Sequence, residues 1–388
     1  MNKLEKILSG LGNFIVKLED FRIDKVIGSG GFGEVYHAIH LKSGTECAVK
    51  KLNFESLEGK HLKYFVREVN VLSKCNYRFL LPFLGFTNSA PFTIITKYIK
   101  NGSLFNALRN KEEYPMIDGT QLTKIAIGVS RGMKELHSLS IIHRDLKSLN
   151  ILLDENYLPK ICDFGVSCFS STGKDDLKTK YIGTAHWMAP ELFSTGNYTA
   201  KVDVYSFGLL LYEMVTKKTP FHKLNAAQVA VAVVMDKERP VIPKNIPNGL
   251  KRLMQRCWRD SPAERPNFPE ILQLFETGQV FFEGTDLKEI ELFVNNLNLT
   301  SYIDEGNPLL ILKETKNENQ EIDKELPDCN IKKMKFNLVP PSLLDFDQEN
   351  QINDVYLNDQ TNDYIDNHIE YTKFNDITEL QPYLKKMK

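Results

Sequence analysis

The chain has 388 residues, enough for two or three average domains or for one large two-lobed domain with a tail. Its 42% hydrophobic and 26% charged residues are ordinary for a globular protein, and no apolar run reaches the length of a membrane span. The net charge of −1 is unevenly distributed, because residues 281–388 carry −11 and residues 1–280 carry +10. A mildly basic body suits a phosphate-rich ligand, although basic residues on a folded surface are mostly just solvated.

Cysteine usage and the first 20 residues argue against a secreted protein. The six cysteines include no Cys-x-x-Cys pair and have no histidine partner at metal-ligand spacing, which favours reduced, mostly buried thiols. The first 20 residues lack the long apolar core of a signal peptide, and Asn2 excludes the usual myristoylation signal. We therefore expect a cytoplasmic, soluble protein without a membrane span.

Residues 1–20 place apolar side chains close to helical spacing and predict a short amphipathic lead-in helix with no chemistry of its own. Residues 21–27 then alternate apolar and polar side chains, which is the period of a β-strand. The pattern Gly-x-Gly-x-x-Gly follows at Gly28, Gly30 and Gly33. By itself this pattern is weak, because dinucleotide-binding folds and chance turns share it.

The residues after the glycines distinguish a dinucleotide-binding fold from a β-hairpin. A dinucleotide-binding unit needs a helix there, whereas residues 35–40 and 46–50 both look like strands and a turn signal separates them. The glycines therefore lie at the tip of a hairpin, where backbone N–H groups can close over phosphates without a side-chain clash. This excludes a dinucleotide oxidoreductase.

Lys50 ends the third of these strands, and Glu68 follows 18 residues later within residues 64–72, which have helical apolar spacing. A lysine at a strand end is most often a surface residue. A glycine loop, a lysine and a glutamate in this order and at this spacing are a more specific signal than any one of them. A buried strand is predicted at residues 92–96 and a long helix at residues 120–137.

The stretch after this helix holds the residues that carry chemistry. In order it contains His143-Arg144-Asp145-Leu146-Lys147, then Asn150, then Asp163-Phe164-Gly165. Two carboxylates and one amide oxygen at this spacing suit metal-bound phosphate chemistry. Each of these residues taken singly could be a polar residue that caps a turn. The whole set at this spacing is too specific for that interpretation. It resembles the catalytic loop and metal-binding motif of the eukaryotic protein kinases.

The resemblance covers about residues 20–278 and implies an α+β, bilobal protein-kinase fold. A small β-rich N-lobe with one key helix would sit against a larger, mainly helical C-lobe. Composition and apolar spacing, outside the range of the resemblance, predict an acidic C-terminal tail with one helix at 286–297 and otherwise disordered. The implied boundaries are a lead-in segment at 1–20, a kinase domain at 21–278 (N-lobe 21–97, hinge about 97–102, C-lobe 103–278) and the tail at 279–388.

The resemblance also implies roles for individual residues. Asp145 would be the catalytic base that accepts the proton of the substrate hydroxyl, and Lys147 would neutralise the phosphoryl group in transfer. Lys50, paired with Glu68, would bind the ATP phosphates. Mg²⁺, with Mn²⁺ as an alternative, would be held by Asn150 and Asp163. The implied ATP-binding residues are Ile27, Gly28, Gly30, Gly33, Val35, Ala48, Lys50, the gatekeeper Thr96, Tyr98, Ile99 and Leu152.

Two signals indicate the class of kinase. Lys147 and Thr184 both favour transfer to Ser/Thr hydroxyls, because in the family they bridge to the base. Trp187-Met188 and residues 203–208 look related to tyrosine kinases. The mixture resembles the tyrosine-kinase-like group of Ser/Thr kinases. The implied structural residues are His143, Phe164, Asp203 and a buried pair of Glu191 with Arg265.

Residues 166–182 are polar and rich in hydroxyl groups, which favours a flexible activation loop. Arg144, beside the base, could pair with a phosphate on this loop and so order it. We expect the phosphorylated residue to be Thr179, with Tyr181 as the second candidate. Transient self-association would allow one copy to phosphorylate another.

The expected function is ATP-dependent transfer of the γ-phosphoryl group to Ser/Thr hydroxyls of protein substrates in intracellular signalling, without a nucleic-acid partner. Alternatives are dual-specificity or tyrosine kinase activity, and a kinase-fold scaffold acting through its acidic tail. If the chain were a catalytically silent scaffold, we would expect another residue in place of Lys50, Asp145, Asn150 or Asp163. All four are present. The tail is either solvated and disordered or a pseudosubstrate that acts on the basic body.

Overall fold

The computed structural model separates the chain into two units, and every residue it describes belongs to the first of them. The tail beyond residue 299 and the two candidate phosphorylation sites lie outside the described residues. The described residues are 8–30, 33–54, 56, 58–109, 114, 117–169, 184–194 and 198–299.

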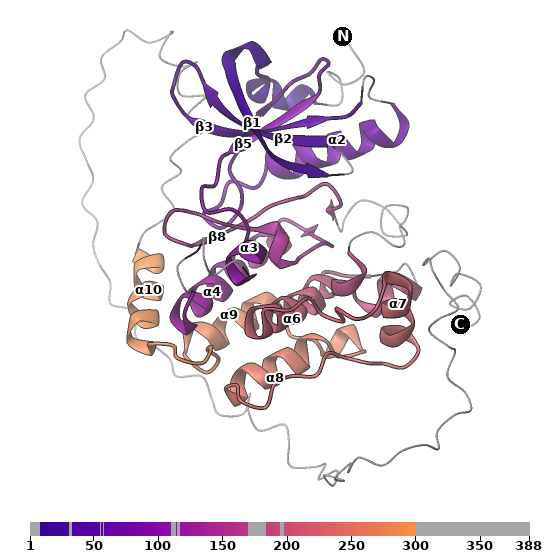
Figure 1. The fold of residues 1–388 in the computed structure, drawn as a ribbon, viewed down its shortest axis with the longest axis vertical. Coiled ribbons are helices and arrows are strands. Elements are labelled where there is room, and N and C mark those ends of the chain that lie inside the picture. Colours follow the sequence, from indigo (N-terminus) through magenta and orange to yellow (C-terminus); the bar gives the residue numbers. More distant parts are fainter. Residues whose placement is uncertain are drawn as a thin grey trace. The chain divides into compact units, whose positions relative to one another are not determined.

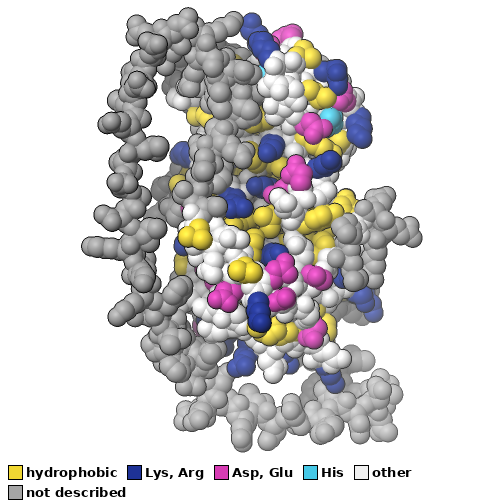
Figure 2. All heavy atoms as spheres, turned by 90° about the vertical axis from the view of Figure 1, so that its left-hand side faces the viewer, with side chains coloured by type: hydrophobic (Ala, Val, Ile, Leu, Met, Phe, Trp, Pro, Cys, Tyr) yellow, Lys and Arg dark blue, Asp and Glu magenta, His cyan; other side chains and the backbone are white. Residues whose placement is uncertain are grey.

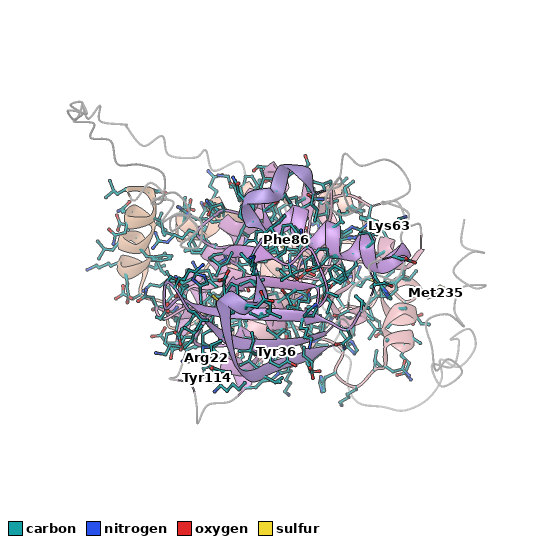
Figure 3. All side chains as sticks on the ribbon, turned by 90° about the horizontal axis from the view of Figure 1, so that it is seen from above. Arg22, Tyr36, Lys63, Phe86, Tyr114 and Met235 are labelled. Atoms are coloured by element: carbon teal, nitrogen blue, oxygen red, sulfur yellow. The ribbon has the colours of Figure 1, made fainter. Side chains whose placement is uncertain are left out.

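A five-stranded antiparallel sheet with strand order β1-β2-β3-β5-β4 forms the N-lobe (Figure 1). Helix α2 (Gly59–Leu72) is the one long helix of this lobe. Seen from above, Arg22 of β1 and Tyr36 of β2 lie toward one edge of the sheet, and Phe86 of β4 lies toward the other (Figure 3). The strands are β1 (Phe21–Gly30), β2 (Gly33–His40), β3 (Glu46–Leu52), β4 (Phe83–Phe86) and β5 (Thr93–Lys97).

The predicted glycine-rich hairpin is confirmed, because β1 and β2 pair up to the bridge between Gly30 and Gly33. A Cβ atom added to Gly33 would lie 2.0 Å from the backbone oxygen of Lys51 on β3, so this position requires glycine. The buried faces of the strands meet in one apolar core. It consists of Phe21, Ala38, Cys47, Val49, Leu84 and Ile95.

The lead-in helix expected before residue 20 is wrong for the part that the structure describes. Two short 3₁₀ helices, η1 (Ser9–Phe14) and η2 (Leu18–Asp20), replace it. Gly10 and Gly12 disfavour an α-helix here. The extended residues between η1 and η2 pair with β4 instead, where the Val16 N–H donates to the backbone oxygen of Phe86 over 3.0 Å.

The C-lobe is mainly helical, with short strands and 3₁₀ turns at the catalytic loop (Figure 1). Its helices are α3 (Leu104–Arg109), α4 (Gly119–Ser138), α5 (Pro190–Ser194), α6 (Lys201–Thr216), α7 (Ala226–Val234), α8 (Asn248–Cys257), α9 (Phe268–Glu276) and α10 (Leu287–Leu299). Its strands are β6 (Ile141–Ile142), β7 (Ile151–Leu153), β8 (Pro159–Ile161) and β9 (Cys168–Phe169). The 3₁₀ turns are η3 (Ser148–Asn150), η4 (Ala185–Trp187) and η5 (Pro262–Glu264).

Helix α6 is the centre of this lobe, because all its residues from 202 to 214 are buried. A helix that is apolar on all sides is stable only inside a core. The structure therefore confirms the α+β class, with a β-rich N-lobe and a helical C-lobe. Among the described helices, none is long and apolar enough to cross a membrane.

Helix α10 packs against α4 and α9 through Ile290, Val294 and Leu297. The Thr123 and Thr285 hydroxyls, 2.8 Å apart, fix the segment that leads into α10. On the face that Figure 2 shows, charged side chains of both signs are intermixed with apolar ones.

Candidate active site

Strand β3 and helix α2 bring Lys50 and Glu68 together. The Lys50 ammonium donates to both carboxylate oxygens of Glu68, over 2.8 and 3.0 Å. Glu68 is buried and Lys50 is partly buried. Burial alone would lower the pKa of Lys50, but attraction to Glu68, to Tyr64 and to Asp163 raises it above the ordinary value. The lysine is therefore a cation held in place by the Glu68 carboxylate.

Tyr64 is a residue of this site that sequence reasoning missed. It lies one helical turn before Glu68 on α2, and the Lys50 ammonium lies 3.5 Å from its hydroxyl oxygen. The hydroxyl also hydrogen-bonds to the Glu68 carboxylate. A Cβ atom added to Gly165 would lie 1.8 Å from the Tyr64 oxygen, so the phenol tip rests on the backbone of Gly165. The only available signal in the sequence was the i, i+4 spacing of Tyr64 and Glu68 on one helix face.

Asp145 accepts hydrogen bonds from three sides. Lys147 Nζ donates to its Oδ2 over 2.6 Å, and Asn150 Nδ2 donates to the same oxygen over 2.9 Å. The backbone N–H and the hydroxyl of Thr184 both donate to Oδ1, each over 2.9 Å. Lys147 also donates to the Thr184 hydroxyl over 2.5 Å. The carboxylate therefore has one fixed orientation.

Asn150 and Asp163 are the residues that could hold a divalent cation. The Asn150 side-chain nitrogen donates to the backbone oxygen and the carboxylate of Asp145, which leaves its side-chain oxygen for a cation. Asp163 has φ +65, a left-handed conformation that a non-glycine residue rarely adopts. Among the described residues no cluster of three His, Cys, Asp or Glu forms a metal cage. Two oxygen donors fit Mg²⁺ better than such a cage, because Mg²⁺ takes few protein ligands and completes its shell with phosphate oxygens and water.

The comparison with known proteins identifies this arrangement. Residues 21–275 match the family model of protein tyrosine and serine/threonine kinases. The chain belongs to this kinase family. The match includes the glycine hairpin, the Lys50–Glu68 pair, the Asp145 loop and Asp163, and members of the family use ATP with a divalent cation.

Curated relatives agree with the family. A probable serine/threonine-protein kinase of Dictyostelium discoideum is 38% identical over 261 residues, 67% of this chain and 28% of that protein. The serine/threonine/tyrosine-protein kinase HT1 of Arabidopsis thaliana is 36% identical over 264 residues, 67% of this chain and 66% of HT1. The serine/threonine-protein kinase CTR1 of the same plant is 35% identical over 258 residues, 66% of this chain and 31% of CTR1. These relatives confirm the resemblance to the tyrosine-kinase-like group, and the chain spans only part of their length.

The residues expected around the adenine ring come from the hairpin of β1 and β2, from β3 and β5, and from the hinge with β7. Ile27, next to Gly28, is 40% exposed on β1, and Val35 pairs with Gly28 from β2. Ala48 of β3 pairs with the buried Thr96 of β5.

The hinge connects this sheet to β7. The Tyr98 N–H donates to the backbone oxygen of Glu46 over 3.2 Å, and Ile99 is buried. A β-bridge between Ser103 and Leu152 then places Leu152 beside the hinge. Leu152 is more exposed than its two neighbours on β7, which are fully buried, so its side chain points away from the core.

Asp203 holds the backbone of the catalytic loop from α6. It accepts the N–H groups of His143 and Arg144 over 2.9 and 2.8 Å, and the His137 ring nitrogen lies 2.8 Å from its Oδ2. Burial alone would raise the pKa of Asp203, but the hydrogen bond and charge of His137 lower it below the usual value. These bonds hold Arg144 at φ +68.

His143 and Phe164 fix the metal-binding motif to the same loop. Both are fully buried, with ring centroids 5.4 Å apart, and His143 Nε2 lies 3.0 Å from the backbone oxygen of Cys162. In the substrate-binding half, Arg265 donates to both carboxylate oxygens of Glu191 over 2.6 and 2.9 Å. Arg265 is 1% exposed, so this ion pair is shielded from water.

Glu213 is a second site residue that the sequence did not reveal. Buried in α6, it accepts hydrogen bonds from Arg109, from the backbone and hydroxyl of Ser148, and from the Trp187 indole, over 2.8–3.2 Å. Burial raises the pKa of Glu213, although the bonds from Ser148 and Arg109 oppose that shift. A lone glutamate in an apolar helix gives no sign of its partners, which lie up to 104 residues away.

Arg144, expected to meet a loop phosphate, is almost fully buried. Its Nη1 donates to the Tyr198 hydroxyl over 2.6 Å. Its Nε and Nη2 have no hydrogen-bond partner among the described residues. Thr179 and Tyr181 lie outside those residues, so Arg144 as a phosphate ligand stays a prediction.

Proposed function

We propose that this chain is an ATP-dependent protein serine/threonine kinase that uses Mg²⁺. The observation that carries the proposal is the closed set of bonds among Asp145, Lys147 and Thr184. Protein kinases work chiefly by positioning and by charge stabilisation, so a fixed base beside a fixed cation is the arrangement the reaction needs.

Each residue then has one task. Asp145 accepts the proton of the substrate hydroxyl and orients its oxygen toward the γ-phosphorus, while the Lys147 ammonium stabilises negative charge on the phosphoryl oxygens. Lys50 binds the phosphates that remain on the leaving nucleotide, and Glu68 keeps its ammonium in position. Asn150 and Asp163 would hold the divalent cation, which when bound would neutralise negative charge on the phosphates.

The Thr184 hydroxyl supports Ser/Thr specificity over tyrosine specificity. The hydroxyl donates to Asp145 and accepts from Lys147, so Thr184 blocks access to the base from its own side. The oxygen of a short Ser or Thr side chain can then reach Asp145 with its backbone close by. Tyrosine would carry its oxygen several ångströms further from the backbone.

The test is phosphate transfer from labelled ATP to a generic protein and to the chain itself, followed by analysis of the phosphoamino acids. We expect phosphoserine and phosphothreonine from the wild type and none from Asp145→Asn or Asp163→Ala. Mainly phosphotyrosine would overturn the Ser/Thr assignment, and phosphotyrosine beside phosphothreonine would show dual specificity. No transfer despite ATP binding would favour the scaffold alternative.

Self-phosphorylation belongs to the same proposal. Arg144 presents two buried donor atoms with no partner among the described residues, and a phosphate on Thr179 could satisfy them. One copy would phosphorylate another through transient association. Mass spectrometry of the wild type and of Thr179→Ala, beside Tyr181→Phe, would identify the residue. A Thr179→Ala enzyme with full activity immediately after purification would exclude Thr179 as the activating site.

A further inference from the structure

We propose that the substrate surface beside Asp145 selects protein segments that carry acidic residues close to the phosphorylated Ser or Thr. This rests on the proposed Ser/Thr kinase function. It concerns the loop between α6 and α7, residues 217–224, which we call the basic loop.

The basic loop is attached to the catalytic site at both ends. Near its start, Arg109 Nη2 donates to the Thr219 hydroxyl over 3.3 Å, and the same atom donates to Glu213. At its end, the His186 ring nitrogen lies 3.0 Å from the backbone oxygen of Leu224. His186 is two residues from Thr184, which bonds to the base. A polypeptide that delivers a hydroxyl to Asp145 therefore passes close to this loop.

The carboxylates around the base are already engaged. Four segments border it on this side, residues 103–109, 145–150, 184–192 and 213–225, and they contain three carboxylates. Asp145 is bonded to Lys147 and Thr184, Glu191 is paired with Arg265, and Glu213 is buried with four donors. In these segments a basic substrate side chain would find no carboxylate without a partner.

Within these four segments, which the structure describes, cations are in excess. Lys217, Lys218, His222 and Lys223 are all exposed, and the basic loop contains no acidic residue. Among the described residues, no carboxylate forms an ion pair with any of its three lysines. Because like charges repel and opposite charges attract over about 8–10 Å at physiological salt, this loop favours acidic segments and disfavours basic ones.

The loop is held by its ends rather than free to turn away. Helix α6 stops at Lys217, which has the left-handed φ +58 of a helix end, and Phe221 also has a positive φ. Asn225 then caps α7 with a reciprocal bond to Gln228. The lysines are therefore presented from a fixed backbone.

Leu149 adds an apolar element to the same surface. It lies between Ser148 and Asn150, which are both buried, yet it is itself 45% exposed. It lies in η3, four residues from Asp145 and next to Ser148, whose hydroxyl donates to the same Glu213 that Arg109 contacts. The substrate class that fits is an acidic segment with an apolar residue near its Ser or Thr.

The experiment compares three peptides that share a central threonine and an apolar neighbour and differ only in having Asp/Glu, Asn/Gln or Lys/Arg flanks. The full chain phosphorylates each, and kcat/KM is measured at ~0.05 M and ~0.5 M salt. We expect the acidic peptide to exceed the basic one by about tenfold at low salt, with the ratio falling at high salt as screening shortens the charge interaction. An acidic tail that competes for the site would lower all three values alike and leave the ratios unchanged.

The matched variants are Lys218→Glu/Lys223→Glu in the basic loop and Lys251→Glu/Arg252→Glu on the exposed face of α8. Both reverse two charges. We expect only the first to bring the acidic-to-basic ratio close to one. A wild type that prefers the basic peptide, or a ratio that the first variant does not alter, overturns the inference while the kinase function stands. No transfer to any peptide or to the chain itself overturns both.

Discussion

The Tyr64 hydroxyl lies where a side chain on Gly165 would begin: a Cβ atom added to Gly165 would be 1.8 Å from it. The same oxygen is 3.5 Å from the Lys50 ammonium and bonds to Glu68. One side chain of α2 thus contacts both Lys50 and the glycine that follows Asp163 and Phe164. The position of α2 and the conformation of the metal-binding motif are therefore coupled through Tyr64.

Tyr64→Phe should raise KM for ATP more than it lowers kcat. The ring still packs on Gly165, but Lys50 and Glu68 lose one polar partner, a loss of ~1 kcal/mol or about fivefold. We expect KM for ATP to rise by about that factor while kcat changes less than twofold, as measured by steady-state kinetics. Tyr157→Phe, on the turn between β7 and β8, is the control. An unchanged KM in Tyr64→Phe would show that the hydroxyl only fills space.

Thr184→Ala should lower kcat because Asp145 loses a hydrogen-bond donor and Lys147 loses an acceptor. A positioned base contributes ~10²–10⁴-fold, and we expect a misplaced one to lose about 10–100-fold in kcat. Thr184→Ser keeps the hydroxyl and should retain most of the activity. Equal losses in the two variants would mean that the methyl group, not the hydroxyl, is what matters.

Arg265→Ala should destabilise the C-lobe strongly. It leaves Glu191 in a site shielded from water without its two charged hydrogen bonds, a change that costs ~3–5 kcal/mol. Thermal unfolding should show a Tm lower by about 10 °C or more. Arg259→Ala breaks an exposed ion pair with Glu264 and should cost less than ~1 kcal/mol. Similar Tm values for the two variants would contradict a special role for the buried pair.

Thiol reactivity should follow burial. Burial raises the pKa of Cys47 to about 11 and the pKa of Cys75 and Cys257 to about 12. A thiol with a raised pKa holds less reactive thiolate at any pH below it, so at pH 8 all three should react slowly in the folded chain. Ellman's reagent on a Cys329→Ser chain should label these three only after urea is added. Rapid labelling of Cys75 in the folded chain would show that the N-lobe opens readily, and rapid labelling of Cys257 would show the same of the C-lobe.

Local chemistry explains why much of the fold was predictable. The hairpin at Gly28, Gly30 and Gly33, the strand that ends at Lys50 and the long helix α4 follow from alternation, turn residues and helical spacing, which act over a few residues. The prediction of a lead-in helix was wrong because the segment depended on contacts with a distant strand, which local spacing does not report. Its apolar spacing suited a helix, but pairing with the edge of β4 offered the backbone partners that an isolated short helix with two glycines could not provide.

The order of the motifs by itself placed this chain in the protein-kinase family and predicted Lys50, Glu68, Asp145, Asn150 and Asp163 as its site residues, because phosphoryl transfer requires those residue types at fixed spacing. Only the tertiary structure decided which side chains support them. Tyr64 on Gly165, Glu213 among Arg109, Ser148 and Trp187, and the basic loop beside His186 all join segments far apart in the chain or in different elements. Such contacts leave no periodic trace in the sequence, because a buried polar group is satisfied by whichever donors the packed fold brings to it.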